Sequence, residues 1–242
     1  MTLRLAMWSG PRNISTAMMR AWENRGDCVV VDEPLYAHYL AHTGLDHPGR
    51  EHVIAAGETD WRRVVAQLTG PLPAAACAIH YQKHMTHHLL PHIGREWLRE
   101  LTHVFLIRDP RDVLMSYVKS RPTVSSEDIG VVQQLEIFRH VSELTGKEPP
   151  VIDAGEFLRA PERQLRLLCD LLGIPFTPRM LSWPPGPRAS DGVWAPHWYA
   201  QVLRSTGFEP YRPRQLQVPA QYEAILAAVL PSFEVLHERR LH

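Results

Sequence analysis

The chain has 242 residues, of which 45% are hydrophobic, and its 26 basic and 26 acidic side chains cancel. A chain of this length and composition can bury a substantial core, so we expect one domain over residues 1–242. The balanced charge favours neither nucleic acid nor an anionic membrane as a partner. There is no run of about eighteen apolar residues and no apolar targeting stretch at the start, so we expect a soluble cytoplasmic protein.

The predicted strands are short and continuously apolar, and each is followed by a helical stretch. Strands that are apolar on both faces are typical of a parallel sheet with helices on both sides. We therefore predict an α/β fold with three layers, in which one parallel sheet is flanked by helices. The predicted strands are Leu3–Met7, Cys28–Val31, Ala75–His80, Val104–Ile107 and Pro150–Asp153.

The loop after the first strand carries a pattern that suits an anion. Gly10, Pro11 and Arg12 follow the strand, and Ser15 and Thr16 can open a helix. Free backbone N–H groups, the positive end of the helix dipole, two hydroxyls and one guanidinium would then converge. The ATPase pattern GxxxxGK[ST], counted from Gly10, requires Gly and Lys where Ser15 and Thr16 stand. The loop is therefore predicted to bind phosphate or sulfate without the ATPase lysine.

A second cation follows the strand Val104–Ile107. Arg108 stands at its carboxyl end, and Asp109 is placed to cap the next helix. Because ligands of parallel sheets bind beyond the carboxyl ends of the strands, Arg108 is expected to face the first loop. Ser116, two turns along the helix, could share an anion with it. The alternative is that Arg108 only pairs with Asp109 or Asp112, as surface arginines often do.

These two segments together resemble the sulfotransferase family. In that family a PRSGST-type loop holds the 5′-phosphosulfate of 3′-phosphoadenosine 5′-phosphosulfate, and PRNIST, Pro11–Thr16, stands in its place. The family segment RDPRDVxxS holds the 3′-phosphate, and RDPRDVLMS, Arg108–Ser116, is similar to it. A weaker similarity covers Val151–Phe176. The resemblance implies a P-loop NTPase-like sulfotransferase fold, this sulfonucleotide as co-substrate, a small-molecule hydroxyl acceptor and no required metal.

The family loop usually has Gly where this chain has Ile14, and Gly there permits close backbone approach. The 3′-phosphate is implied to bind Arg108 and Ser116. The residues implied at the 5′ end are Gly10, Pro11, Arg12, Asn13, Ile14, Ser15 and Thr16.

Sulfuryl transfer to an alcohol requires a base and positive charge near the oxygens that gain negative charge. Glu33, at the carboxyl end of the second strand, is the leading candidate base, and some bacterial sulfotransferases have a glutamate at the comparable place. Glu33 could instead cap the following helix, or Asp32 could be the base. Lys83 and Arg12 are expected to stabilise the developing charge. His84 is the rival base, because its pKa lies naturally near working pH.

His84, His87, His88 and His92 also suggest a metal site, since positions four apart share a helix face. Pro91 interrupts such a helix, and no cysteine or clear carboxylate accompanies the set. We therefore favour solvated or substrate-contacting histidines and predict no metal.

Two segments are possible lids, 41–73 and 182–198. The first is rich in Gly, His, Pro and charges, and it either covers an acceptor site or is a surface connection. The second is rich in Pro and Trp and cannot be a regular helix or central strand. The resemblance implies a late loop that closes over the nucleotide, with Arg188, Gly192 and Trp194 as candidates. The alternative is a rigid surface loop.

Near the end of the chain, Ala220–Arg240 is predicted to be a packing helix that Pro231 breaks. The function predicted from the sequence is sulfuryl transfer to a hydroxyl. A nucleotide-dependent kinase of related fold is disfavoured, because the Walker lysine is missing. A nucleotide-binding module that transfers nothing is the other alternative.

Overall fold

The computed structural model describes residues 2–72, 77–119, 123–213 and 217–242. One five-stranded sheet, parallel throughout, forms its centre and has the strand order β2-β3-β1-β4-β5. The predicted α/β fold is confirmed. The strands are β1 (Leu3–Ser9), β2 (Cys28–Asp32), β3 (Ile79–Met85), β4 (Thr102–Ile107) and β5 (Val151–Asp153).

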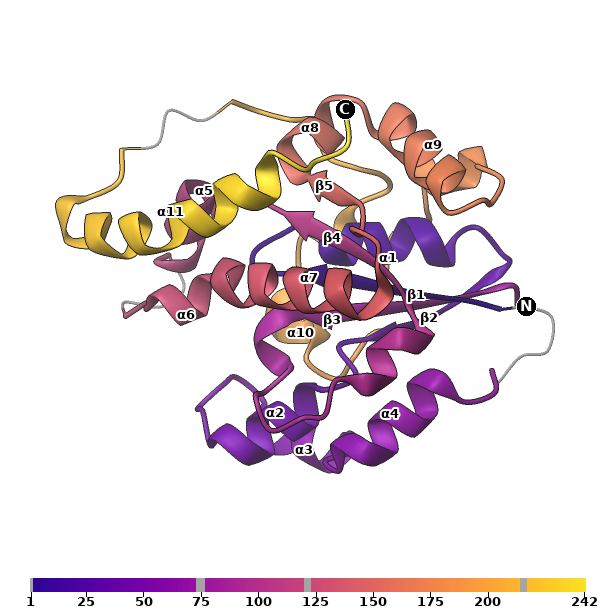
Figure 1. The fold of residues 1–242 in the computed structure, drawn as a ribbon, viewed down its shortest axis with the longest axis horizontal. Coiled ribbons are helices and arrows are strands. Elements are labelled where there is room, and N and C mark those ends of the chain that lie inside the picture. Colours follow the sequence, from indigo (N-terminus) through magenta and orange to yellow (C-terminus); the bar gives the residue numbers. More distant parts are fainter. Residues whose placement is uncertain (1, 73–76, 120–122, 214–216) are drawn as a thin grey trace.

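Helices cover both faces of the sheet (Figure 1). One apolar cluster joins the sheet to α1 (Ser15–Glu23), α8 (Ala154–Arg159) and α9 (Pro161–Leu171). The cluster on the opposite face includes α4 (Trp61–Thr69), α7 (Val131–Thr145) and α11 (Glu223–His237). The predicted three layers are therefore present.

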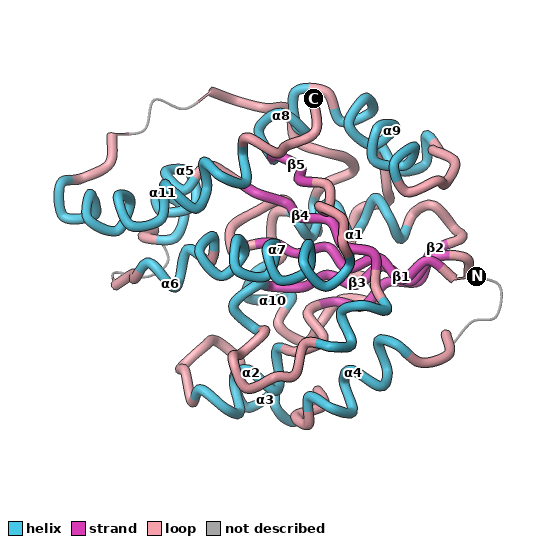
Figure 2. Tube along the Cα trace, viewed as in Figure 1, coloured by secondary structure: helices cyan, strands magenta, loops and turns pink. Residues whose placement is uncertain are grey.

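A third, smaller cluster lies beyond the β2 edge, where α2 (Tyr36–Thr43) and α3 (Arg50–Ala56) pack against α10 (Ala195–Trp198). Figure 2 shows that loops, in pink, connect these helices to the rest of the chain. The remaining elements are α5 (Pro110–Tyr117), α6 (Ser126–Ile129) and the 3₁₀ helices η1 (Thr86–His88), η2 (Glu96–Glu100), η3 (Pro178–Leu181), η4 (Val202–Arg204) and η5 (Ala220–Tyr222). In the described part of the chain, no helix is long and apolar enough to cross a membrane.

The strand order places a topological switch point at β1. The chain leaves β1 through α1, on one face, and leaves β3 through η2, on the other face. Crevices at such points, beyond the carboxyl ends of the strands, are where open α/β sheets bind ligands. The loops after β1 and β3 both open onto this edge.

The third strand was predicted too early in the sequence. Residues 75 and 76 of the predicted strand lie outside the described residues, and β3 runs on to Met85. The polar sequence Gln82-Lys83-His84 resembles a loop, but these side chains are buried with polar partners. Lys83 and His84 therefore lie inside the strand and not after it.

The prediction that Pro231 breaks the last helix is wrong. Helix α11 runs through Pro231 without interruption. Pro231 is exposed, so water can bind the carbonyl that the missing N–H leaves free. Val229, Phe233 and Leu236 pack into the core on both sides of it and hold the helix together.

Candidate active site

The loop after β1 is shaped by close backbone contacts. A Cβ on Gly10 would lie 2.8 Å from the carbonyl oxygen of Ile129, so glycine is required there. Arg12 adopts φ 56°, a left-handed conformation that is rare for residues other than glycine. Helix α1 then begins at Ser15, and the first turn carries no acidic residue and no side-chain cap from Ile14. Its N–H groups are thus available to an anion.

The Asn13-Ile14 pair has a structural role. The Asn13 carboxamide donates to the carbonyl oxygen of Leu106 at 2.9 Å and accepts from the N–H of Ile14 at 2.8 Å. Ile14 packs against the apolar cluster on the α1 face. The loop is therefore fixed to β4 and to the core, where the family pattern has the more flexible glycine.

Arg108 faces this loop, as predicted. Its Nη1 donates to the carbonyl oxygen of Arg12 at 2.7 Å, and Arg12 Nε donates to Ser116 Oγ at 3.0 Å. Asp109 caps α5 through the N–H of Arg111, which aims the end of β4 at the loop. Arg108 Nε also lies 3.8 Å from Asp112, so the alternative pairing is present as well. The structure thus brings Arg12, Arg108 and Ser116 together.

A buried ion cluster lies at the ends of β2 and β3. Lys83 Nζ is 2.9 Å from Asp32 and 2.7 Å from Glu33, and the Lys83 residue is only 1% exposed. Glu33 adopts φ 41°; with Arg12 it makes up the non-glycine positive-φ residues of the described chain. Non-glycine residues with a positive φ are strained, and such residues are found most often at functional sites. The Glu33 carboxylate pairs with Lys83, while Leu35 is the N-cap of α2 and makes no side-chain cap.

Tyr199 completes this cluster, and no motif in the sequence pointed to it. Its Oη donates to Asp32 at 2.5 Å and accepts from Lys83 Nζ at 2.7 Å. Burial raises the pKa of Tyr199 well above 10, so the phenol keeps its proton. Trp194 Nε1 donates to the same oxygen at 3.1 Å. Tyr199 and Asp32 are 167 positions apart in the sequence, so no local pattern predicts this contact.

Burial and neighbouring charges set the protonation states of Glu33 and Lys83. Burial raises the pKa of Glu33, the Lys83 ammonium opposes this rise, and Asp32 adds to it. Burial alone would lower the pKa of Lys83, but Asp32 and Glu33 hold it well above its usual value. Lys83 therefore stays charged, and Glu33 is a carboxylate whose proton affinity is increased.

His88 lies beside Glu33 and was not singled out from its neighbours. Its Nδ1 is 3.9 Å from Glu33 Oε2 and has no hydrogen-bond partner among the described residues. Its ring stacks on Tyr36 at 4.7 Å. Burial lowers the pKa of His88 well below its usual value, so the imidazole is neutral. A buried polar atom without a partner at this position suits a ligand hydroxyl.

His84, the rival base, occupies a different place. Its ring stacks on Trp8 at 4.4 Å, and Nε2 contacts Gln82 Oε1 at 3.2 Å. Trp8 belongs to the cluster on the α4 and α7 face of the sheet. Burial lowers the pKa of His84 to about 3. This geometry does not bring His84 to the Glu33 cluster, because alternate residues of a strand point to opposite faces.

Segment 182–198 packs over α1 and α2. Arg188 Nη1 binds Glu23 Oε2 at 3.0 Å. Glu23 is the last residue of α1, at the end away from the loop after β1, so the structure does not bring Arg188 to that loop. The N–H of Gly192 donates to Asp32 at 3.3 Å, and a Cβ there would clash with the Trp194 ring. Gly192 and Trp194 therefore border the ion cluster.

The other predicted lid, 41–73, contains α3 and α4. Val64 and Leu68 of α4 are buried in the core, so this part forms a layer of the fold. Residue 73 lies outside the described residues. A cavity of about 490 Å³ lies beyond α2, lined by Tyr39, His87, Tyr117 and Asp128 among others. Tyr39 also contacts the ring of His88, which lies 3.9 Å from Glu33.

Comparison with known proteins finds a family match and related sequences and structures. The Sulfotransferase domain family matches residues 3–240. Branched-chain-amino-acid aminotransferase-like proteins 2 and 1 of Arabidopsis thaliana are 36% and 37% identical to the chain over 236 and 235 residues. Each match covers 97% of this chain, which spans only 41% and 42% of the length of these relatives.

Solved structures share the fold at low identity. The sulfotransferase from Alicyclobacillus acidocaldarius has a TM-score of 0.54 at 13% identity, over 100% of this chain and 98% of that one. The sulfotransferase domain from the Synechococcus PCC 7002 olefin synthase has a TM-score of 0.53 at 14% identity, over 95% and 94%. Given the family match over nearly its whole length, the chain belongs to the sulfotransferase domain family.

Proposed function

We propose that this chain transfers a sulfuryl group from 3′-phosphoadenosine 5′-phosphosulfate to a hydroxyl of a small-molecule acceptor. The observation that carries the proposal is the contact between the two anion-binding segments, in which Arg108 bonds to the Arg12 carbonyl and Arg12 to Ser116. Two cations and an open helix N-terminus within one loop system suit a ligand with separate phosphate groups.

The residues present fit this donor. The first turn of α1, with Ser15 and Thr16, offers N–H groups and hydroxyls for the 5′ end. Arg108 and Ser116 suit the 3′-phosphate. Bound there, the sulfonucleotide would supply the sulfuryl group and the bisphosphate leaving group.

The acceptor side is supported by the buried ion cluster. Glu33 Oε2 lies 3.9 Å from His88 Nδ1, which has no hydrogen-bond partner in the described part of the chain, and at this spacing both atoms can contact one hydroxyl. Glu33, with its raised proton affinity, would take the hydroxyl proton, and Lys83 would stabilise negative charge. The cavity beside Tyr39 is of a size for a small molecule.

Ligand-dependent thermal stability tests the donor assignment. We expect 3′-phosphoadenosine 5′-phosphate to raise the Tm, with about 2.7 kcal/mol of stabilisation at a hundred times its Kd, and AMP to raise it much less. Stabilisation by ATP with magnesium but not by the bisphosphate would favour a kinase. If the bisphosphate binds, transfer of radiolabelled sulfate to a pooled acceptor library distinguishes an enzyme from a binding module.

A further inference from the structure

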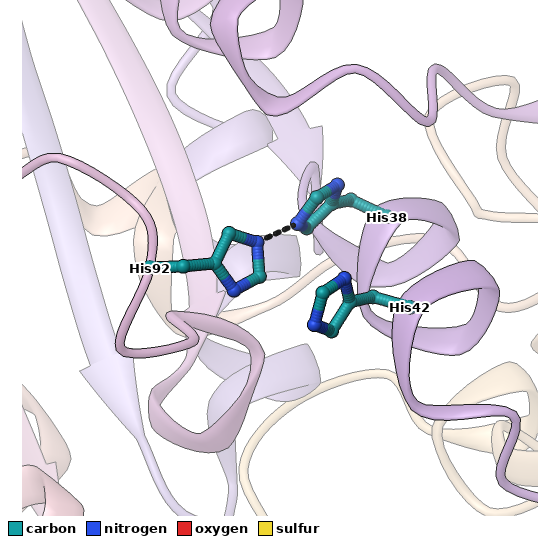
Figure 3. A group of neighbouring side chains, drawn as sticks. All are labelled: His38, His42 and His92. Atoms are coloured by element: carbon teal, nitrogen blue, oxygen red, sulfur yellow. Dashed lines mark hydrogen bonds between the residues drawn. The ribbon is translucent and has the colours of Figure 1, made fainter.

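Three histidines from two separate segments meet beside the third apolar cluster (Figure 3). His38 and His42 project from successive turns of α2, and His92 comes from the loop between η1 and η2. One nitrogen of each ring can be chosen so that all three atoms lie within 4.8 Å of one another. The sequence pattern had grouped His92 with His84, His87 and His88 instead, because contacts across elements cannot be read from spacing.

The tautomer of His38 is fixed by its surroundings. Its Nδ1 lies 2.7 Å from the carbonyl oxygen of Thr59, which can only accept, so Nδ1 carries the proton. Nε2 therefore presents a lone pair, and it meets His92 Nε2 at 3.0 Å. Metal-binding histidines in proteins are commonly oriented in this way, by a carbonyl on the second ring nitrogen. His38 is thus already arranged as a ligand.

The cluster is accessible from solvent. His38 is buried, whereas His42 and His92 are exposed, so an ion can reach the two exposed rings from outside.

We propose that His38, His42 and His92 bind one divalent first-row metal ion of the zinc class, with water as a fourth ligand. Ligand nitrogens of a tetrahedral zinc ion lie about 3.3 Å apart. One nitrogen of each ring lies within 4.8 Å of the other two, and the Nε2 atoms of His38 and His92 are 3.0 Å apart, so the three rings are close enough to share one ion. Three imidazoles without a carboxylate in the group select zinc, copper or nickel over magnesium or calcium.

The ion would connect two elements that lead away from the candidate active site. Helix α2 follows Glu33, and the loop that carries His92 follows β3, which contains Lys83. A metal bridge between them fixes the wall on the acceptor side without touching the reacting atoms. The site is independent of the proposed sulfuryl transfer, since metal binding can be measured without any activity.

Cobalt and zinc titrations of the whole chain test this proposal. We expect one Co²⁺ per chain with a visible ligand-field band, displaced by Zn²⁺, and a higher Tm with Zn²⁺. The variants His42→Ala and His92→Ala change exposed residues and should each weaken Zn²⁺ binding about 100-fold and abolish the Tm shift.

The matched control is His52→Ala, which removes an exposed histidine of α3 outside the cluster. It should bind both ions as the unmodified chain does, which would show that the loss in the other two variants is not a general effect of removing one of the 14 histidines. The proposal is overturned if the unmodified chain gives no cobalt band. It is equally overturned if His42→Ala and His92→Ala bind Zn²⁺ as tightly as the control.

Discussion

The two halves of the candidate active site are built in opposite ways. At the ends of β1 and β4, the site consists of a partly exposed loop, its backbone N–H groups, the exposed Arg12 and the partly exposed Arg108. At the ends of β2 and β3, Asp32, Glu33 and Lys83 are largely buried, and both carboxylates pair with the Lys83 ammonium. The first half therefore offers cations and N–H groups that suit an anionic ligand. In the second half the charged groups are already paired within the protein, and a carboxylate there is suited to accepting a proton.

The difference has an energetic meaning. Exposed charges are screened by water, so losing one affects ligand binding far more than folding. Buried charges depend on their partners, so losing one leaves an uncompensated charge in the interior. Removing a charged side chain should therefore weaken ligand binding in the first half and lower the stability of the fold in the second.

The largest effect is expected from Glu33→Gln. Removing the base should lower kcat for sulfate transfer by about 100- to 10,000-fold and leave binding of the bisphosphate nearly unchanged. In the unmodified chain, activity should fall with decreasing pH at a value above 4.5, because burial raises the pKa of Glu33. Glu162→Gln, on an exposed ion pair, is the control and should be fully active. Full activity of Glu33→Gln would rule out its role as base.

A large loss of stability is expected from Lys83→Met. Without the ammonium, Asp32 and Glu33 stay buried without a cation, so we expect about 3–5 kcal/mol of destabilisation in urea unfolding. Combining it with Asp32→Asn and Glu33→Gln should restore part of this loss. The comparison variant Arg166→Met breaks only an exposed pair with Glu162. Equal stability of Lys83→Met and Arg166→Met would mean that the pairing of Lys83 with Asp32 and Glu33 does not contribute to the stability of the fold.

Arg108→Ala should spare folding and impair binding. We expect the Kd of 3′-phosphoadenosine 5′-phosphate to rise by about 10- to 100-fold, because charge-assisted hydrogen bonds to the 3′-phosphate are lost. Adenosine 5′-phosphosulfate, which lacks that phosphate, should be affected much less. Arg111→Ala, at the start of the same helix, is the matched control. Equal weakening of both nucleotides would remove the assignment of Arg108.

The smallest expected effect is the pH dependence contributed by His84. In the folded chain burial lowers its pKa to about 3, while the unfolded chain takes up the proton near 6.5. Its contribution to stability is complete above pH 6.5 and is lost as the pH falls from 6.5 toward 3. Between pH 6.5 and 5 this amounts to about 2 kcal/mol. The free energy of unfolding, measured in urea, should therefore change between pH 6.5 and pH 5 by about 2 kcal/mol less in His84→Gln than in the unmodified chain. The same change in both proteins would contradict the assignment of a lowered pKa to His84.

Sequence reasoning worked best where a strand, its loop and the next helix are consecutive. The capping of α5 by Asp109, the opening of a helix at the Ser15-Thr16 pair and the approach of Arg108 to the first loop were all predicted. Each follows from local hydrogen bonding or from the rule that parallel strands end at one edge. The loop that holds Arg188 was predicted to reach the nucleotide, but Glu23 holds its guanidinium elsewhere.

The sequence by itself determined the parallel sheet, the two segments predicted to bind anions and the family, because these depend on apolar runs, caps and turns within short stretches. Only the tertiary structure decided that β3 continues through Lys83, that Tyr199 joins Asp32, and that His92 meets α2. These contacts join residues far apart in the chain. A buried polar side chain is stable only when such a distant partner satisfies it, and no local pattern records which partner that is.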